Sequence, residues 1–391
     1  MTLVSPKVAD SSTGLSQREK TASTMVKINE AVSEVIASNI NPREKAVSDY
    51  SGLSKQIRDA GLLARTLPFY FKLFGSVTAL GVIAWISVFL IGDSWWNLIP
   101  AALLGIFTAQ YGFFAHEASH RQIFSSKKVN DWAGLIAADL FVGLGYGFWM
   151  KKHQKHHVTP NQVGEDPDIN IRVLAFTKAD YDAKKGLEKV ATKNQGWMFP
   201  FLLLFTGFDL LFDSFKTVLN PKSVLKFRWL EIIFLTIRLA VPLTIAFSLM
   251  NPLLATAFFM VNMMVFGFFM GGAFAPNHKG MPILPKTARV DFLRRQVLTS
   301  RNIRPSFITD ILMGGLNYQI EHHLFPSMPR PHLKEARRLT KIYCETHGIP
   351  YMETKLLESY KLVIAHLSKV GLAQNADPFD CPVTAQFGYR S

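Results

Sequence analysis

Residues 97–120 read NLIPAALLGIFTAQYGFFAHEASH, an apolar run that ends in a pair of histidines. The part from 97 to 115 carries no charged side chain, and a helix that crosses a bilayer needs about 20 mostly apolar residues. His116 and His120 stand four residues apart, so they share one face of a helix. The segment therefore predicts a membrane-spanning helix that continues out of the bilayer and presents two imidazoles just beyond it.

Three further stretches have the length and composition of spanning helices. Residues 73–92 and 253–275 contain no charge, and residues 230–250 contain only Glu231 and Arg238, near their start, where a long side chain reaches the interface. Short links join the first stretch to the second and the third to the fourth. We therefore expect an all-α membrane protein with four spans in two hairpins, at residues 73–92, 97–115, 230–250 and 253–275.

Charge is distributed unevenly along the chain. The 391 residues include 43 Lys and Arg against 29 Asp and Glu, a net charge of +14. The two links, residues 93–96 and 251–252, contain no Lys or Arg, so the basic residues outside the spans fall before, between or after the hairpins. The positive-inside rule places those regions, with both termini, on the cytoplasmic side. Anionic headgroups then explain the basic charge, and we expect no nucleic-acid partner.

The other apolar stretches are shorter or interrupted. Residues 134–150 contain one aspartate and residues 197–215 contain two, so we expect helices in or near the interface; the alternative is a further pair of spans. Residues 1–25 lack the apolar core of a signal peptide. Residues 26–66 look amphipathic and helical, and Pro68 ends that stretch. We divide the chain into a cytoplasmic N-terminal segment (1–68), a main domain (69–345) and a cytoplasmic C-terminal tail (346–391).

Eight of the eleven histidines fall in four tight places, all on the expected cytoplasmic side and close to a span. The segment KHQKHH, residues 152–157, places three imidazoles at i, i+3 and i+4, over an arc wide enough for two metal ions. The segment QIEHH, residues 319–323, repeats this pattern with Gln319 in the first place. The candidate metal ligands are His116, His120, His153, His156, His157, His278, His322 and His323.

Eight imidazoles exceed what one tetrahedral zinc ion needs, and they fit two metal ions with open positions. The pair of Glu-x-x-His motifs that di-iron carboxylate bundles use does not occur. Cys344 and Cys381 are too few for a disulfide scaffold or a four-cysteine site. The other histidines, His332, His347 and His366, have the isolated placement of surface or capping residues. We infer a histidine-rich di-metal centre in a cytoplasmic helical cap, just under a membrane face.

The motifs H-x-x-x-H, H-x-x-H-H and Q-x-x-H-H, placed around two hairpins, resemble those of the integral-membrane fatty acid desaturases. The run NYQIEHHLFP, residues 317–326, is similar to the third histidine box of bacterial acyl-CoA and acyl-lipid desaturases. The resemblance extends over most of the chain, from residue 67 to residue 343. It implies that the eight histidines ligate two non-haem iron ions.

We also make predictions for several residues near the histidine boxes. Some members of the family have an Asn four residues before the isolated histidine, but here that position is Phe274. Gln319 replaces a histidine of other members, and an amide ligates only weakly, through its oxygen. Residues 161–168 (N-x-x-x-x-D-P-D) hold histidine tautomers, meet the substrate headgroup or simply form a polar turn. The residues expected to support the ligands, or to bind metal weakly, are Gln319, Asn277, Glu117, Asn161, Asp166 and Asp168.

The resemblance implies an oxidoreductase that inserts a cis double bond into a fatty acyl chain with O₂ and two external electrons. An unactivated methylene offers no acidity to a side-chain base, so the cofactor must carry out the difficult step. We expect an acyl-CoA desaturase acting at Δ9. The alternatives within the fold are an acyl-lipid or front-end desaturase and a fatty acyl hydroxylase or ketolase.

The sequence contains no His-Pro-Gly-Gly motif of a fused haem domain, no cysteine cluster for iron–sulfur and no dinucleotide loop. We therefore expect a separate electron donor, of ferredoxin or cytochrome type, with an NAD(P)H reductase. The other expected partners are a fatty acyl-CoA or acyl-lipid, O₂ and membrane lipid. The expected location is a bacterial inner membrane.

Two other classes of protein fit parts of the sequence. The segment 116–120, HEASH, matches the H-E-x-x-H motif of zinc proteases, in which the Glu is the general base. A single zinc site, however, leaves the histidines of the second and third boxes unexplained. A bis-histidine haem carrier holds its ligands within facing spans, whereas no predicted span contains a histidine.

Overall fold

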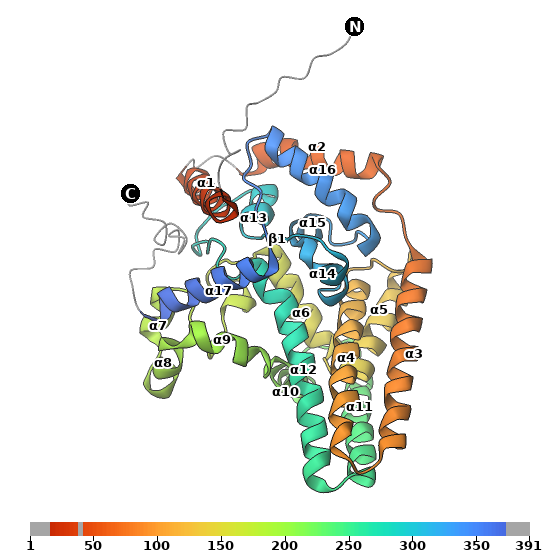
Figure 1. Cartoon of the computed structure of the whole chain (residues 1–391). Coiled ribbons are helices and arrows are strands. Elements are labelled where there is room, and N and C mark those ends of the chain that lie inside the picture. Colours follow the sequence, from red (N-terminus) through yellow and green to blue (C-terminus); the bar gives the residue numbers. More distant parts are fainter. Residues whose placement is uncertain (1–15, 38–41, 373–391) are drawn as a thin grey trace.

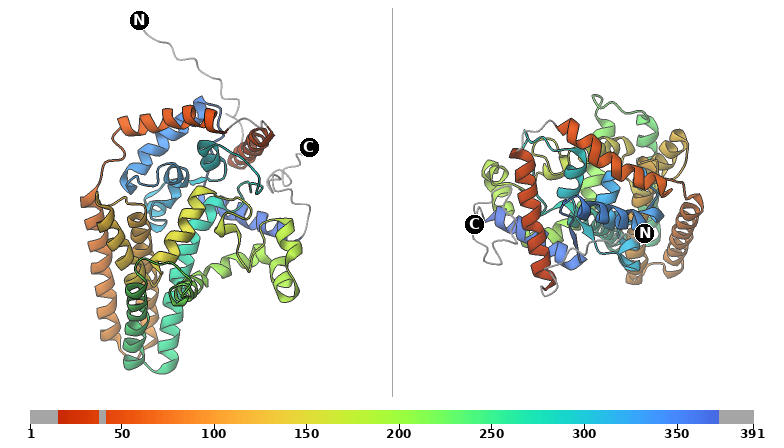
Figure 2. Two further views of the ribbon diagram at one scale, coloured as in Figure 1. Left: turned by 180° about the vertical axis from the view of Figure 1, so that it is seen from behind. Right: turned by 90° about the horizontal axis from the view of Figure 1, so that it is seen from above.

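The computed structural model describes residues 16–37 and 42–372, and these are mostly helical (Figure 1). Four long helices lie side by side, and the short links that join them in pairs lie at the same end (Figures 1 and 2). All four are long and apolar enough to cross a membrane, and up to six spans result if two bent helix pairs are each counted as one. The four are α3 (Leu67–Ile91), α4 (Leu98–Ser119), α11 (Arg228–Leu249) and α12 (Pro252–His278).

Each long helix overlaps one of the stretches predicted to span the membrane. α3 begins six residues before the predicted start, and α4 and α12 continue past the apolar runs to Ser119 and His278, so histidine motifs stand on these long helices themselves. Pro68 lies in the first turn of α3, whereas the sequence analysis assigned it to the end of the preceding segment. Proline is favoured in a first turn because the N–H that it lacks has no partner there.

α4 and α12 pack closely at the centre of the bundle. A Cβ at Gly105 would lie 2.7 Å from the backbone oxygen of Asn262, so the approach requires glycine. The Asn262 amide donates a hydrogen bond to the Ala101 carbonyl at 3.2 Å, which satisfies a buried polar group. At the far end, the Asp93 carboxylate accepts hydrogen bonds from the backbone and side-chain nitrogens of Asn251 at 2.9 and 2.8 Å. These contacts tie the two links together.

The stretch 134–150 was predicted as one interfacial helix, and the structure breaks it. It covers the end of α5 (Lys127–Leu135), the π-helix η2 (Ile136–Val142) and the start of α6 (Tyr146–Val158), with a bend of 112°. Gly143 ends the π-helix with φ of 88°, a left-handed conformation that suits glycine. The break turns α6, which carries the second histidine box, toward α4 and α12.

The stretch 197–215 is also broken, with a bend of 71° between α9 (Gln195–Leu203) and α10 (Thr206–Leu219). A Cβ at Gly207 would lie 2.7 Å from the Met263 carbonyl oxygen, so the start of α10 lies directly on α12. Tertiary packing of this kind leaves no local signal in a hydrophobic run.

Most of the remaining helices gather at the end of the bundle where α4 and α12 finish, while α7 and α8 lie to one side of the bundle (Figures 1 and 2). There, α2, α13, α15 and α16 share one apolar core that includes Leu53, Ile57, Val297 and Leu324. This core holds α15, which carries the third histidine box. The remaining helices of the described residues are α1 (Gln17–Ala37), α2 (Pro42–Asp59), α7 (Lys178–Ala183), α8 (Gly186–Lys193), α13 (Phe292–Leu298), α14 (Phe307–Leu312), α15 (Gln319–Leu324), α16 (Leu333–Thr346) and α17 (Leu356–Gly371). Four 3₁₀ turns and a two-stranded parallel sheet complete the fold: η1 (Trp95–Asn97), η3 (Pro167–Ile169), η4 (Leu316–Tyr318), η5 (Arg330–His332), β1 (Asn302–Ile303) and β2 (Glu353–Thr354).

The N-terminal and C-terminal segments take part in this packing. The amphipathic stretch 26–66 contains the end of α1, all of α2 and the chain that leads to α3; residues 38–41 lie outside the described part. α1 begins at Gln17, earlier than expected, and buries Met25, Ile28 and Val32. In the tail, α17 lies against α9, where a Cβ at Gly196 would meet the Ile364 carbonyl oxygen at 2.8 Å. Residues 373–391 lie outside the described part.

Candidate metal centre

Four helices bring the eight candidate histidines together at the end of the bundle, where it meets α2, α13, α15 and α16, the four helices here called the cap. α4 contributes the pair that begins at His116, and α12 contributes its last residue, His278. α6 contributes three histidines, and α15 contributes two adjacent ones, His322 and His323. The side chains form two groups, and within each group the possible ligand atoms all lie within 4.8 Å of one another. The groups are His116, His120, His153, His157 and His322, and His156, His278 and His323.

The five-histidine group is centred on His153. Its Nε2 atom lies 2.9 Å from Nε2 of His116, 2.8 Å from Nε2 of His120 and 3.0 Å from Nε2 of His157. The Nε2 atom of His322 completes the group, 3.1 Å from that of His157. The i, i+4 spacings in α4 and α6 produce this convergence, because they place each pair of rings on one helix face.

The three-histidine group lies beside the first. Nε2 of His278 is 3.3 Å from Nε2 of His156 and 3.1 Å from Nε2 of His323. His156 therefore belongs to a different group from its neighbours in α6, and the i, i+3, i+4 arc is wide enough to reach both groups. The rings of His157 and His323, one from each group, stack with centroids 4.2 Å apart, so the two groups share a boundary.

The arrangement fits metal ions better than hydrogen bonding. One ring nitrogen makes one hydrogen bond, yet Nε2 of His153 has three nitrogen neighbours within 3.0 Å. Nitrogens at adjacent positions around a five- or six-coordinate ion lie about 3.0 Å apart when metal–nitrogen distances are about 2.1 Å. Burial lowers the pKa of His120 to about 3 and that of His322 and His323 well below the usual value. These three rings are therefore neutral at pH 7, the state that binds a metal, whereas the carboxylates of Asp166 and Asp168 outweigh burial and raise the pKa of His156.

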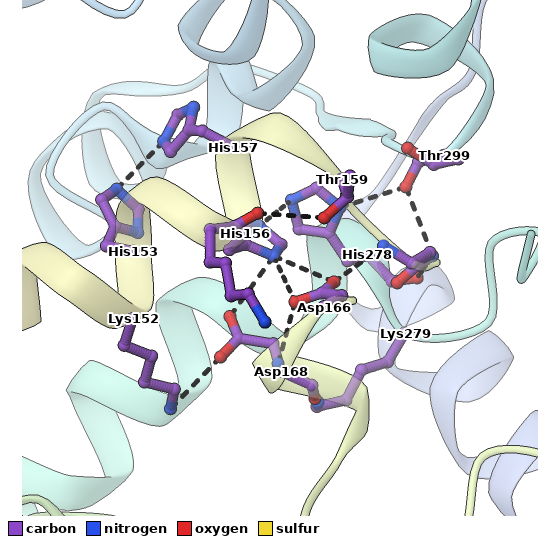
Figure 3. A network of polar contacts seen from close by, with 12 residues as sticks. Lys152, His153, His156, His157, Thr159, Asp166, Asp168, His278, Lys279 and Thr299 are labelled. Atoms are coloured by element: carbon purple, nitrogen blue, oxygen red, sulfur yellow. Dashed lines mark hydrogen bonds and ion pairs between the residues drawn. The ribbon is translucent and has the colours of Figure 1, made fainter. Parts of the chain in front are cut away.

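Each ring of the three-histidine group is held through its other nitrogen. Nδ1 of His156 donates to both carboxylate oxygens of Asp166 at 3.1 Å, as Figure 3 shows. Nδ1 of His278 donates to the Thr299 carbonyl at 3.0 Å, and Nδ1 of His323 lies 2.9 Å from Oε1 of Gln296. Such partners fix the tautomer that leaves Nε2 free for a metal.

The polar segment after the second box supports this group. The Asp166 carboxylate also accepts hydrogen bonds from the backbone nitrogens of Asn161 and Asp168 at 2.7 and 2.8 Å. The Asn161 amide donates to the His278 carbonyl at 3.0 Å. Asp168 pairs with Lys152 at 3.2 Å (Figure 3). The segment is thus both a polar turn and a brace for His156 and His278.

Glu117 faces away from the histidines. Its carboxylate accepts two hydrogen bonds from the Arg330 guanidinium, at 2.6 Å from Nε and 2.7 Å from a terminal nitrogen, and both side chains are buried. Among the described residues, Glu117 belongs to neither histidine group. A glutamate engaged in this way cannot serve as the general base of a zinc protease, although the H-E-x-x-H pattern is present.

Gln319 and Asn277 lie at the edge of the three-histidine group. Nε2 of Gln319 is 2.9 Å from Nε2 of His278, and Oε1 of Gln319 is 3.2 Å from the Asn277 amide nitrogen. Both side chains are fully buried. The structure thus brings these two residues to the centre, where the sequence analysis expected them.

An aromatic wall borders the five-histidine group. Trp149 stacks on His153 with centroids 4.7 Å apart, and the Phe274 ring lies 5.8 Å from that of His116. The two aromatic rings lie 5.7 Å from each other. Trp149 and Phe274 each stand four residues before a histidine of the centre; the sequence analysis noted Phe274 only in place of an Asn ligand and did not single out Trp149.

The sequence analysis also missed Gln296 and Thr299. They come from α13 and the residue after it, far from any histidine motif, so no local pattern marks them. The isolated histidines stay outside the groups, as expected, but His366 lies half-buried within α17 and is neither a surface nor a capping residue. Of the other two, His332 lies 3.1 Å from the Ala64 carbonyl oxygen, and His347 Nδ1 lies 2.8 Å from that of Tyr343.

Comparison with known proteins assigns the chain to a family. The family model for fatty acid desaturases matches residues 93–355. A Delta(6)-fatty-acid desaturase of Caenorhabditis elegans is 28% identical over 344 residues, which cover 85% of this chain and 77% of that one. A Delta(8)-fatty-acid desaturase of Euglena gracilis is 27% identical over 342 residues (83% and 79% of the two chains), and an acyl-lipid (9-3)-desaturase of Physcomitrium patens is 28% identical over 295 residues (71% and 54%). The chain belongs to the fatty acid desaturase family, and it is an integral membrane oxidoreductase that uses O₂ to act on fatty acyl chains.

Proposed function

We propose that this desaturase holds two non-haem iron ions, one in each histidine group, and inserts a cis double bond into a fatty acyl chain. The observation that carries the proposal is the convergence of eight imidazoles, six of them buried and two partly buried, into two adjacent groups. Five nitrogen ligands exceed the four of a tetrahedral zinc ion, and imidazole suits iron. The proposed ligands are the eight histidines predicted from the sequence.

The proposed reaction converts two neighbouring methylenes to a double bond. O₂, two electrons and two protons enter, two hydrogen atoms leave the acyl chain, and two waters form. The iron ions would supply the activation of O₂. The protein holds the acyl chain with the reacting carbons beside the centre, and positioning of this kind contributes up to about 7–11 kcal/mol in favourable cases. Trp149 and Phe274 form the apolar surface against which we place those carbons.

For the position of the double bond, we propose a front-end activity, in which the new bond forms between the carboxyl end and an existing double bond. The names of the relatives, Delta(6), Delta(5) and Delta(8) desaturases, support this alternative over the Δ9 acyl-CoA activity expected from the sequence. The acyl-lipid relative supports an acyl group carried on a lipid.

We also propose that α3, α4, α11 and α12 cross the membrane as two hairpins, with the cap and the centre in the cytoplasm. The support is the distribution of charge, because the links at the opposite end of the bundle contain no Lys or Arg. Electrons would come from a separate ferredoxin- or cytochrome-type donor with an NAD(P)H reductase. We also propose that this membrane is a bacterial inner membrane.

The test is expression in a host that lacks its own desaturases, followed by mass analysis of total fatty acids. One culture receives a saturated acyl chain, and another receives a chain with double bonds distant from the carboxyl group. We expect a new double bond near the carboxyl end in the second culture only. Product in the saturated culture would reject the front-end assignment, and a hydroxylated product would reject desaturation. A matched host that expresses His157→Ala serves as the control.

A further inference from the structure

The side chain of Gln319 occupies the place of a fourth ligand beside the three-histidine group. Its terminal Nε2 lies 2.9 Å from Nε2 of His278, closer than His323 lies to that atom at 3.1 Å. An amide binds a metal through its oxygen, because the nitrogen lone pair is delocalised into the carbonyl. The role of Gln319 therefore depends on which end of the amide faces the histidines, and hydrogen-bond partners decide that.

Asn277 determines the orientation of Gln319 from one side. The Asn277 side-chain nitrogen lies 2.8 Å from the Ala273 carbonyl oxygen and 3.1 Å from that of Leu316. Carbonyls only accept hydrogen bonds, so this atom is the NH₂ group, whose two hydrogens are shared among three acceptors. The Gln319 atom that faces it at 3.2 Å must be Oε1. Rotating the Gln319 amide by half a turn would place two NH₂ groups against each other in a site where Asn277 is fully buried.

His278 imposes the same orientation from the other side. Its Nδ1 donates to the Thr299 carbonyl, so Nδ1 carries the hydrogen and Nε2 is an acceptor. The Gln319 atom that faces Nε2 is therefore a donor, the NH₂ group. Once an ion takes the Nε2 lone pair this second constraint is lost, but the contact with Asn277 does not depend on the ion.

We propose that Gln319 is not a metal ligand but a positioning residue that Asn277 holds with its NH₂ group turned toward the three-histidine group. This inference rests on the proposed di-metal centre. The ion in this group then has three protein ligands and more open positions than its neighbour with five. A hydrogen-bond donor stands beside those positions, available to an oxygen atom of a ligand from outside the protein. The two ions are therefore unequal, and the chelator-sensitive one is that of the three-histidine group.

Two variants test the inference in the purified full-length protein loaded with Co²⁺, whose visible absorption reports coordination. Gln319→Leu removes both polar ends of the side chain. Gln319→Glu keeps the shape and the acceptor for Asn277 but replaces the NH₂ group with a potential ligand oxygen. The measurements are Co²⁺ per chain, the visible spectrum and the rate of ion release to a chelator.

We expect Gln319→Leu to retain two ions per chain, an unchanged spectrum and a release rate within about tenfold of the parent protein. We expect Gln319→Glu to change the spectrum and slow the release of the more labile ion. Loss of one ion in Gln319→Leu, or a parent-like spectrum in Gln319→Glu, would mean that Gln319 already ligates through oxygen and would overturn the inference. If Gln319→Leu does not fold, the spectrum of Gln319→Glu alone decides. Because none of these measurements depends on product, they are separable from a failure of the proposed desaturation.

Discussion

The buried ion pair between Glu117 and Arg330 predicts a large, partner-dependent loss of stability. The pair is bidentate, at 2.6 and 2.7 Å, and exposes only 3% of the Glu117 side chain and 9% of the Arg330 side chain. Arg330→Met keeps the apolar stem but leaves the Glu117 carboxylate buried without a counter-ion. Removing one partner of such a pair costs about 3–5 kcal/mol. We therefore expect Arg330→Met to lower the free energy of unfolding by about that amount.

The same substitution is expected to weaken metal binding. Glu117 lies between His116 and His120 in the last turn of α4. Without Arg330, its charged carboxylate would move toward water and so disturb the turn that presents both imidazoles. The measurements are thermal unfolding of the detergent-purified protein and iron per chain. Arg338→Met is a matched control, because Arg338 pairs with Glu335 at 2.6 Å on the surface, where loss of an ion pair has little effect.

A double variant separates the ion pair from simple loss of packing. Replacing both partners by apolar residues, Glu117→Leu with Arg330→Met, removes the unpaired charge and should restore much of the lost stability. The reasoning is refuted if Arg330→Met is no less stable than Arg338→Met, or if the effects of the two single substitutions simply add in the double variant.

Three further substitutions follow from the geometry. His157→Ala should abolish the new double bond while the protein stays in the membrane fraction, and product in the fatty acid profile would contradict its assignment as a ligand. Asp166→Asn should weaken the metal affinity of the three-histidine group by about 10- to 100-fold, because His156 loses a charged acceptor; an unchanged chelator titration would count against this support. Gly105→Val should lower stability by about 1–3 kcal/mol, because its Cβ meets α12, and an unaltered melting temperature would show that the helices can separate without cost.

The candidate ligands were predictable because their spacing is local. The i, i+4 pair in α4 and the i, i+3, i+4 set in α6 need only helical geometry to bring their rings to one side. The apolar runs likewise marked the four long helices to within a few residues at most ends. Local periodicity therefore predicts the helices that carry the site, although it does not show which histidines share a group.

The rest depends on contacts between distant parts of the chain. Gly143 breaks the helix predicted over 134–150, but a glycine in an apolar run also occurs in unbroken helices such as α4. Gln296 holds His323 from α13, and Arg330 reaches Glu117 across 213 positions of sequence. The orientation of the Gln319 amide requires the positions of two backbone carbonyls. No spacing rule encodes such partners, because tertiary packing brings them together.

The distribution of ligands couples the centre to the docking of the cap. Each histidine group draws on helices of the bundle and on α15, so neither group is complete unless the cap lies on the bundle. Ions that bind only the docked arrangement stabilise it by mass action. Conversely, residues of the cap core such as Leu324, and the ion pair of Arg330 with Glu117, influence metal binding without touching an ion. The polar centre and the apolar contacts that hold the cap are thus parts of one folding equilibrium, which explains why so many of its supporting residues lie far from the histidine boxes.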